Sequence, residues 1–105
     1  MDDQVLTLEA YVADGLLRIA LTGALVDGTT ARLRTWMQRH VPRSAGRLVL
    51  DLRGLTDVDA VGLGALLAAH RRLDAGAEVL LDGASPAVAR ALHQAGLDRV
   101  LPPAA

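Results

Sequence analysis

Ser85 is the residue of this chain that most resembles a catalytic nucleophile. It lies in the segment 83–87, Gly-Ala-Ser-Pro-Ala, which has one of the two glycines of the strained turn that exposes the serine of many hydrolases. The second glycine is missing, and Pro86 follows the serine. That pair favours a helix that begins at Pro86 with Ser85 as its N-cap. We therefore predict no serine nucleophile.

Asp57 and Asp59 place two carboxylates two residues apart, as in a metal site or an acid/base pair. A calcium loop would also need a third ligand, a glycine in mid-loop and a distant glutamate, and these are missing. The pattern favours a helix that Asp59 caps and a solvated loop acid at Asp57. The chain has no cysteine, and its three histidines lie 30 and 23 residues apart, so no local metal motif exists. We predict neither a catalytic nor a metal site.

Gly62 and Gly64 resemble half of a phosphate-binding loop. A dinucleotide fingerprint needs a third glycine where this chain has Leu67, and a Walker A motif needs a lysine, which the chain lacks. We therefore expect no cofactor. A glycine inside a helix costs up to ~1 kcal/mol relative to alanine. We expect these glycines to allow a close approach to the sheet, or to face a partner at the surface.

Composition and charge narrow the class of protein. The chain has 105 residues, enough for a single domain over 1–105, and 51% hydrophobic residues are enough for a core. Residues 1–4 are acidic and polar, unlike a signal peptide, and no apolar run approaches the ~18–20 residues of a membrane span. We expect a cytoplasmic protein without membrane insertion.

Basic residues are concentrated in one part of the chain. Residues 32–53 carry six arginines and one aspartate, although the net charge of the whole chain is only −1. Because no nucleic-acid-reading motif accompanies them, a solvated outer helix face explains these arginines better than a nucleic-acid site. We predict no nucleic-acid partner.

The elements alternate between strands and helices. Alternating apolar residues on both sides of the Asp-Gly turn at 14–15 predict a hairpin. The spacing of apolar residues, helix-capping residues and prolines predict the later strands and the helices. We expect a loop over 23–28 and a frayed tail over 102–105. The predicted strands are 5–12, 16–21, 48–52, 77–81 and 100–101, and the predicted helices are 30–41, 60–73 and 86–95. This β-β-α-β-α-β-α-β order indicates an α/β fold with a mixed sheet.

The segment 48–67, Leu-Val-Leu-Asp-Leu-Arg-Gly-Leu-Thr-Asp-Val-Asp-Ala-Val-Gly-Leu-Gly-Ala-Leu-Leu, resembles the signature of STAS domains, the family of anti-sigma-factor antagonists. That family has an apolar strand, a loop, and Asp-Ser-Ser-Gly-Leu-Gly at the start of a helix. Residues 23–26 are similar to its earlier Gly-Glu-Leu-Asp segment, and 88–97 to its closing Leu-x-x-x-Gly-Leu.

The resemblance implies a mixed sheet with helices packed on one side and a role in partner switching. An antagonist of this family binds an anti-sigma kinase-type ATPase, which phosphorylates a serine of the Asp-Ser-Ser-Gly motif. Here Ala60 and Val61 replace the two serines, and the usual acceptor falls on Val61. In the earlier segment Ala24 replaces the glutamate and Val26 the aspartate, with Asp27 one residue later.

We therefore expect a non-enzymatic protein-interaction module that binds an anti-sigma factor of the kinase-type ATPase class and is not phosphorylated at the usual position. It would be a monomer or a weak homodimer. The expected partner-binding residues are Asp27, Thr29, Asp57, Asp59, Ala60, Val61, Gly62 and Leu63.

Other functions remain open from the sequence. An accessory STAS subunit of a lipid-transport ATPase complex is one alternative, and a small nucleotide-binding domain is another. Thr29, Thr30 and Thr56 are hydroxyls near the usual phosphorylation position. We interpret them as loop or capping residues.

Overall fold

The N-terminal hairpin begins the sheet. Strands β1 (Leu6–Ala13) and β2 (Leu16–Leu25) pair antiparallel around the Asp14-Gly15 turn, where both residues have positive φ angles of 54° and 76°. Short turns between twisted strands require such angles, and Asp-Gly tolerates them. The computed structural model describes residues 4–104. The acidic start of the chain, 1–3, and Ala105 lie outside the described residues.

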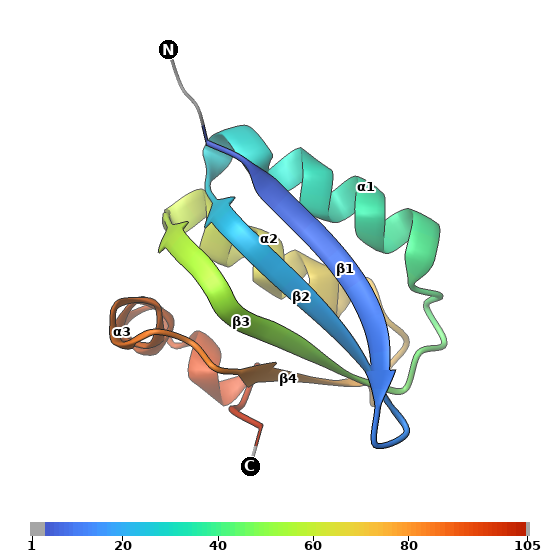
Figure 1. Ribbon diagram of the computed structural model, residues 1–105. Coiled ribbons are helices and arrows are strands. Elements are labelled where there is room, and N and C mark those ends of the chain that lie inside the picture. Colours follow the sequence, from blue (N-terminus) through green and yellow to red (C-terminus); the bar gives the residue numbers. More distant parts are fainter. Residues whose placement is uncertain (1–3, 105) are drawn as a thin grey trace.

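The remaining strands extend the sheet in parallel. Strand β3 (Arg47–Val58) lies between β2 and β4 (Glu78–Asp82), and both of these pairings are parallel. The strand order is β1-β2-β3-β4 (Figure 1). The predicted mixed sheet, with its antiparallel hairpin and its central strand at 48–52, is confirmed.

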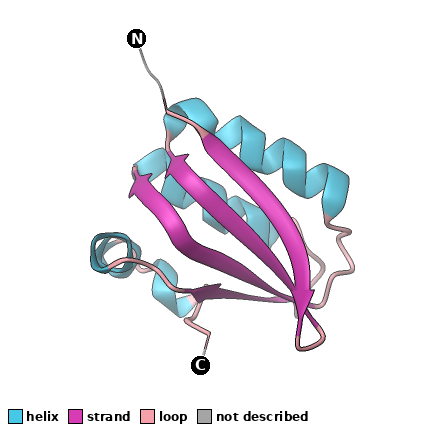
Figure 2. Ribbon diagram, in the orientation of Figure 1, coloured by secondary structure: helices cyan, strands magenta, loops and turns pink. Residues whose placement is uncertain are grey.

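Among the described residues, three α-helices accompany the sheet. Figure 2 shows α1 and α2 along one side of it, and α3 lies beside its β4 edge. The predicted cap of α3 is confirmed, because the Ser85 hydroxyl accepts a hydrogen bond of 3.2 Å from the Val88 amide and Pro86 is the first helical residue. The helices are α1 (Thr30–His40), α2 (Ala60–Arg71) and α3 (Pro86–Gln94), with short 3₁₀ turns at η1 (Asp27–Thr29) and η2 (Leu97–Arg99).

Two strands are longer than the sequence predicts. The expected loop over 23–28 begins later, because β2 continues to Leu25, and β3 continues six residues past the predicted end at Leu52. These two extensions pair with each other, with a register shift at Gly23. Polar residues and glycines in both segments suggested loops. Each segment is a strand because the other one offers a hydrogen-bonding partner.

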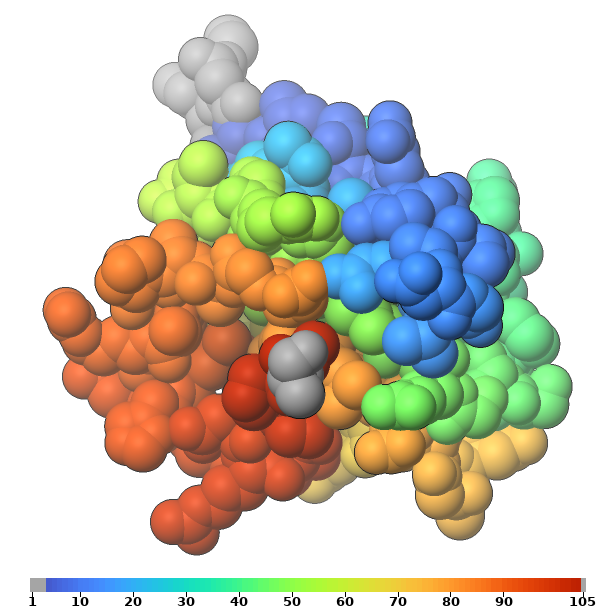
Figure 3. All heavy atoms as spheres, turned by 60° about the horizontal axis from the view of Figure 1, so that its bottom comes forward, coloured from blue at the N-terminus to red at the C-terminus, as the bar shows by residue number. Residues whose placement is uncertain are grey.

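The predicted strand at 100–101 is wrong, and so is the predicted fraying of the tail up to Ala104. A 3₁₀ turn occupies 97–99, and the chain then pairs with β4 through a single parallel bridge between Leu81 and Pro103. The Leu81 amide donates to the Pro102 carbonyl, and the Ala104 amide donates to the Leu81 carbonyl, at 2.9 and 2.7 Å. Figure 3 shows this red C-terminal segment against the orange surface of the β4 region. The proline-rich tail therefore covers a sheet edge.

Leucines from the strands and helices form the core on the helix side of the sheet. Leu50 of β3 and Leu66 of α2 are both fully buried, as the sequence predicts. The other fully buried large side chains are Leu6, Ile19, Leu21, Leu25, Leu33, Met37, Leu48, Leu52, Leu55 and Leu101.

Polar side chains cross the opposite face of the sheet. Arg18 and Asp51 directly follow or precede core residues in their strands, so they point away from the helices. The Tyr11 hydroxyl donates to Asp51 at 3.2 Å, and Arg18 forms an ion pair with Asp82. Arg53 donates to both Asp51 oxygens, at 3.0 and 2.8 Å. The apolar spacing of the strand did not reveal this network, which joins all four strands.

We expect Leu50→Ala and Leu66→Ala each to lower the free energy of unfolding by about 2–5 kcal/mol, because each leaves a cavity in a packed core. Denaturant unfolding measures the change. Val12→Ala is the control, because Val12 is 72% exposed and its truncation should cost less than about 0.5 kcal/mol. Equal losses at all three positions would contradict this placement of the core.

Asp51→Asn should destabilise the protein at neutral pH by about 1–2 kcal/mol, because it weakens hydrogen bonds to a charged, buried acceptor. The Arg53 guanidinium lowers the pKa of Asp51 to about 2. The stabilisation is therefore fully present above the ordinary carboxyl pKa of 3.8 and is lost as the pH falls through about 2. Unfolding of both proteins between pH 2 and 7 checks this. A difference that stays constant down to pH 2 would contradict it.

Candidate functional site

Two segments that are distant in the sequence meet where β2 and β3 end. The Asp59 carboxylate joins them, because Oδ1 accepts a hydrogen bond of 2.7 Å from the Gly62 amide and Oδ2 accepts one of 3.0 Å from the Asp27 amide. The predicted N-cap of α2 is confirmed. The second bond of Asp59, to the Asp27 amide in η1, was not predicted from the sequence. One side chain thus fixes both the start of α2 and the loop before α1.

The two hydrogen bonds act on the charge of Asp59. Backbone donation from Gly62 first, and from Asp27 second, lowers the pKa of the Asp59 carboxyl. Both donors favour the ionised form, because a carboxylate is the stronger acceptor. Asp59 is therefore ionised over the whole neutral range, and it keeps the loop and the helix in register there.

Gly62 is required by the close approach of α2 to the end of β2. A Cβ atom at this position would overlap the backbone carbonyl of Leu25, which cannot move as a side chain could. A Cβ at Gly64 would meet nothing within 4 Å. The prediction that this end of the helix approaches a neighbouring backbone is confirmed for Gly62. Gly64 faces open space.

Thr29 shapes the loop from inside. Its side chain is 7% exposed, and its hydroxyl donates to the Ala24 carbonyl at 2.7 Å and accepts from the Val26 amide at 3.0 Å. Thr56 is exposed, and its hydroxyl donates to the Gly23 carbonyl at 2.9 Å. Both hydroxyls therefore hold backbone of the β2–α1 region, although Thr56 lies in β3 and not in the expected loop.

Some of the expected partner-binding residues are exposed to solvent and others are buried. Asp27, Asp57, Ala60 and Val61 are exposed, and Val61 shows 49% of its surface. Asp59 and Leu63 are partly exposed, whereas Thr29 and Gly62 lie beneath the surface. We name the exposed and partly exposed residues the loop surface. Thr29 and Gly62 position that surface and do not present side chains on it.

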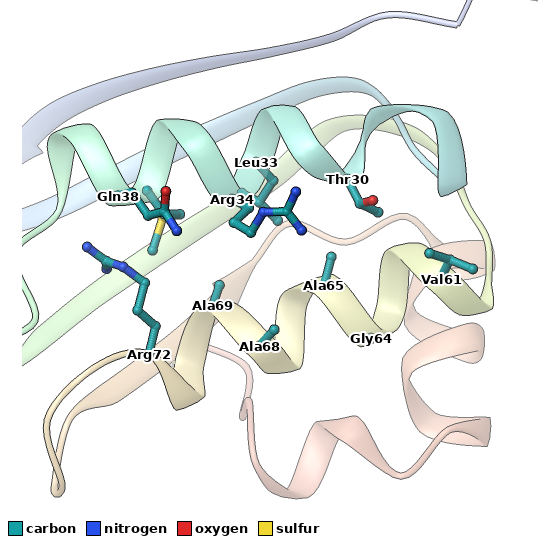
Figure 4. A pocket seen from close by; sticks show the side chains of 11 residues that line it. Thr30, Leu33, Arg34, Gln38, Val61, Gly64, Ala65, Ala68, Ala69 and Arg72 are labelled. Atoms are coloured by element: carbon teal, nitrogen blue, oxygen red, sulfur yellow. The ribbon is translucent and has the colours of Figure 1, made fainter.

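A groove between α1 and α2 continues from Val61 along both helices. It has a volume of about 440 Å³. Figure 4 shows Thr30 and Val61 near the beginnings of the helices, and Gln38 and Arg72 at the other end. The lining residues are Thr30, Leu33, Arg34, Met37, Gln38, Val61, Gly64, Ala65, Ala68, Ala69 and Arg72. We name this feature the α1–α2 groove.

The groove was missed in the sequence, although a signal for it exists. Small residues recur at 61, 64, 65, 68 and 69, which is the spacing of one helix face. The leucines of this helix mark its buried side and give no sign of this second face. A second face of small residues next to another helix leaves room between the two helices.

Metal-binding clusters and helices that could cross a membrane are both absent from the described residues. Within 4–104, no three His, Asp or Glu side chains gather closely enough to hold a metal ion. No helix in the same range has the length and apolar character needed to cross a bilayer.

Comparisons with known proteins agree on one family. The STAS domain model matches residues 7–105. The anti-sigma F factor antagonist of Paenibacillus polymyxa is 30% identical over 90 residues, which cover 84% of this chain and 77% of that protein.

Two solved structures are also similar. The crystal structure of an anti-sigma factor antagonist from Mycobacterium paratuberculosis superposes with a TM-score of 0.84 and 26% identity, over 96% of this chain and 86% of the other. The anti-sigma factor antagonist SpoIIAA in its unphosphorylated form has a TM-score of 0.74 and 23% identity, over 96% and 89% of the two chains.

Gly62→Ala and Gly64→Ala should change stability in opposite directions. The first forces a methyl group against the Leu25 backbone and should cost about 1–3 kcal/mol. The second meets no neighbour and improves helix propensity, so it should stabilise by up to ~1 kcal/mol. Thermal and denaturant unfolding of the two variants provide matched controls for each other. Similar effects of both substitutions would contradict the position of α2 against β2.

Proposed function

The chain belongs to the STAS domain family, and from that premise we propose that it is an anti-sigma-factor antagonist that binds an anti-sigma kinase-type ATPase through the loop surface. We further propose that it is not phosphorylated at the position that the family uses, because that position is Val61. The module is non-enzymatic and acts in the cytoplasm, as a monomer or a weak homodimer.

The observation that supports the proposal is the geometry around Val61, which has no hydroxyl and stands where the resemblance places the acceptor serine. Asp59 caps α2 and holds the Asp27 amide, so the two segments form one continuous surface. In the middle of that surface the second residue of α2 is Val61, half exposed and without a hydroxyl. A phosphate would add about −1.5 to −2 charges at the helix start and change what can dock. Val61 cannot take one, and its apolar surface can contribute buried area to an interface instead.

The neighbouring hydroxyls are poor substitutes for the missing serine. Thr29 is buried and hydrogen-bonded on both sides, so a kinase would have to open the loop to reach it. Thr56 is exposed, but its hydroxyl already holds the Gly23 carbonyl. Both roles are structural, and this supports a module whose binding is not switched off by phosphorylation.

The binding experiment uses purified anti-sigma kinase-type ATPases from the same genome, with calorimetric titration in the presence of ADP or ATP. We expect one of them to bind this chain. Ala60→Arg and Val61→Asp should each weaken that binding at least about tenfold, because they place charge in the centre of the contact. Arg90→Glu, on the exposed side of α3, is the control and should leave the affinity unchanged.

The phosphorylation experiment incubates the bound ATPase and ATP with the wild type and with Val61→Ser, and maps phosphate by mass spectrometry. We expect phosphate on the serine of the variant and none on the wild type. Stoichiometric modification of the wild type at Thr56 or Thr29 would overturn the claim of an unswitched module. If no such ATPase binds, the proposed partner class is wrong, and a role as an accessory subunit of a lipid-transport ATPase complex becomes the better hypothesis.

A further inference from the structure

The α1–α2 groove has apolar walls and unneutralised arginines. Leu33 and Met37 form the buried wall on α1, and Ala65 and Ala69 form the facing wall on α2. No aspartate or glutamate lines it. Figure 4 shows Arg34 extending from α1 toward α2, and Arg72 extending from the end of α2 toward Gln38. The groove is therefore an apolar trough with positive charge along its sides.

The chain itself does not neutralise these two arginines. Among the described residues, the Arg34 side chain has no ion pair or hydrogen bond. Arg72 donates to the Val41 carbonyl, but its Nη1 atom is buried and has no hydrogen-bond partner. A buried donor without a partner is costly, and a charged donor more so. Arg34 is exposed and both guanidinium groups line the groove, so carboxylates of a molecule in the groove can pair with the parts of these groups that face it.

Gly64 is a second, independent reason to expect that another molecule binds in the α1–α2 groove. It lies in the second turn of α2, where glycine costs roughly 1 kcal/mol relative to alanine. Gly62 is explained by the nearby Leu25 carbonyl, whereas no atom of residues 4–104 would lie within 4 Å of a Cβ at Gly64. With Ala65 and Ala68 it leaves a shallow surface, and such a surface lets another backbone approach α2 closely.

We propose that the α1–α2 groove binds an amphipathic helix of the partner ATPase, which places small apolar side chains against α2 and carboxylates against Arg34 and Arg72. This proposal rests on the proposed function, and it extends the same surface, because Val61 belongs to both the loop surface and the groove. From Val61 to Arg72 the groove follows about 11 residues, or roughly 16 Å, so a partner helix of about three turns fills it.

The charges of the two surfaces fix the direction of docking. The loop surface carries the exposed acids Asp27 and Asp57 beside the start of both helices. The groove carries Arg34 and, at its far end, Arg72 (Figure 4). A partner with basic groups facing the loops and acidic groups along the helix is attracted in one orientation and repelled in the reverse one.

The direct test uses two synthetic peptides of about three helical turns, held helical by a side-chain lactam because short peptides are otherwise marginal helices. Both have an alanine and leucine face, which is flanked by glutamates in one peptide and by lysines in the other. NMR spectra of the labelled protein report binding. We expect the glutamate peptide to shift the amides of Gly64, Ala65 and Ala68, and the lysine peptide not to. Absence of these shifts, or equal binding of both peptides, would overturn the proposal.

Two variants sharpen the test without disturbing the fold. Gly64→Leu fills the groove and raises helix propensity, so it should abolish binding of the glutamate peptide while the midpoint of thermal unfolding does not fall. Arg34→Glu should weaken that binding at least about tenfold and allow the lysine peptide to bind. Ala87→Leu and Arg90→Glu on α3 are the matched controls, and they should leave the binding of both peptides unchanged. Gly64→Leu that binds like the wild type would refute the groove as the site.

The same variants separate this proposal from the one on which it rests. If an ATPase binds the wild type, Gly64→Leu and Arg34→Glu equally well, but loses affinity for Ala60→Arg, then the groove proposal fails and the proposed function stands. If no ATPase binds the wild type, the proposed function fails. The peptide spectra then still decide whether the groove accepts an acidic helix.

Discussion

The Asp59 carboxylate is the constraint on which the rest of the binding region depends. Its two oxygens take different partners, the Gly62 amide at the start of α2 and the Asp27 amide in the loop before α1. A side chain that caps one helix is common, but here the same group also orders the loop that leads into a second helix. Both helices therefore begin at defined positions relative to the ends of β2 and β3. These two hydrogen bonds therefore help to position the loop surface and the start of the α1–α2 groove.

The two glycines of α2 differ in whether the fold itself explains them. Gly62 lies against the Leu25 carbonyl, so the fold itself accounts for it. Gly64, two residues further along α2, lines the groove and has no described neighbour that would exclude a side chain. Glycine in a helix is unfavourable by roughly the same amount at either position. The fold explains the cost of glycine at Gly62 but not at Gly64. A contact with another molecule would explain it at Gly64, as the groove proposal states.

The sequence predicted elements that depend on local signals and missed those that depend on a partner strand or helix. The Asp-Gly hairpin, the Ser85 and Asp59 caps and the leucine spacing are local, and all were correct. The extensions of β2 to Leu25 and of β3 to Val58 were missed, because each is a strand only by pairing with the other. The link from Asp51 to another strand was missed for the same reason, since Tyr11 is 40 residues away, although Asp51 also pairs with Arg53 only two residues along β3. At the site, the family motif located 57–64, but the groove requires two helices side by side.

Under the proposed function, Val61 stands at the position of the family's acceptor serine, and this difference would change what the loop surface can do. A phosphorylated hydroxyl at this position would add negative charge beside Asp27, Asp57 and Asp59, and affinity would then depend on the phosphorylation state. The apolar side chain of Val61 would remove that dependence and offer area that can be buried. If the proposed function holds, release of a partner would come from the partner's own conformational or nucleotide state, since a ligand shifts an equilibrium only through its different affinities for two states. The acidic residues of the loop surface and the arginines of the α1–α2 groove would then act as fixed charges that orient a partner.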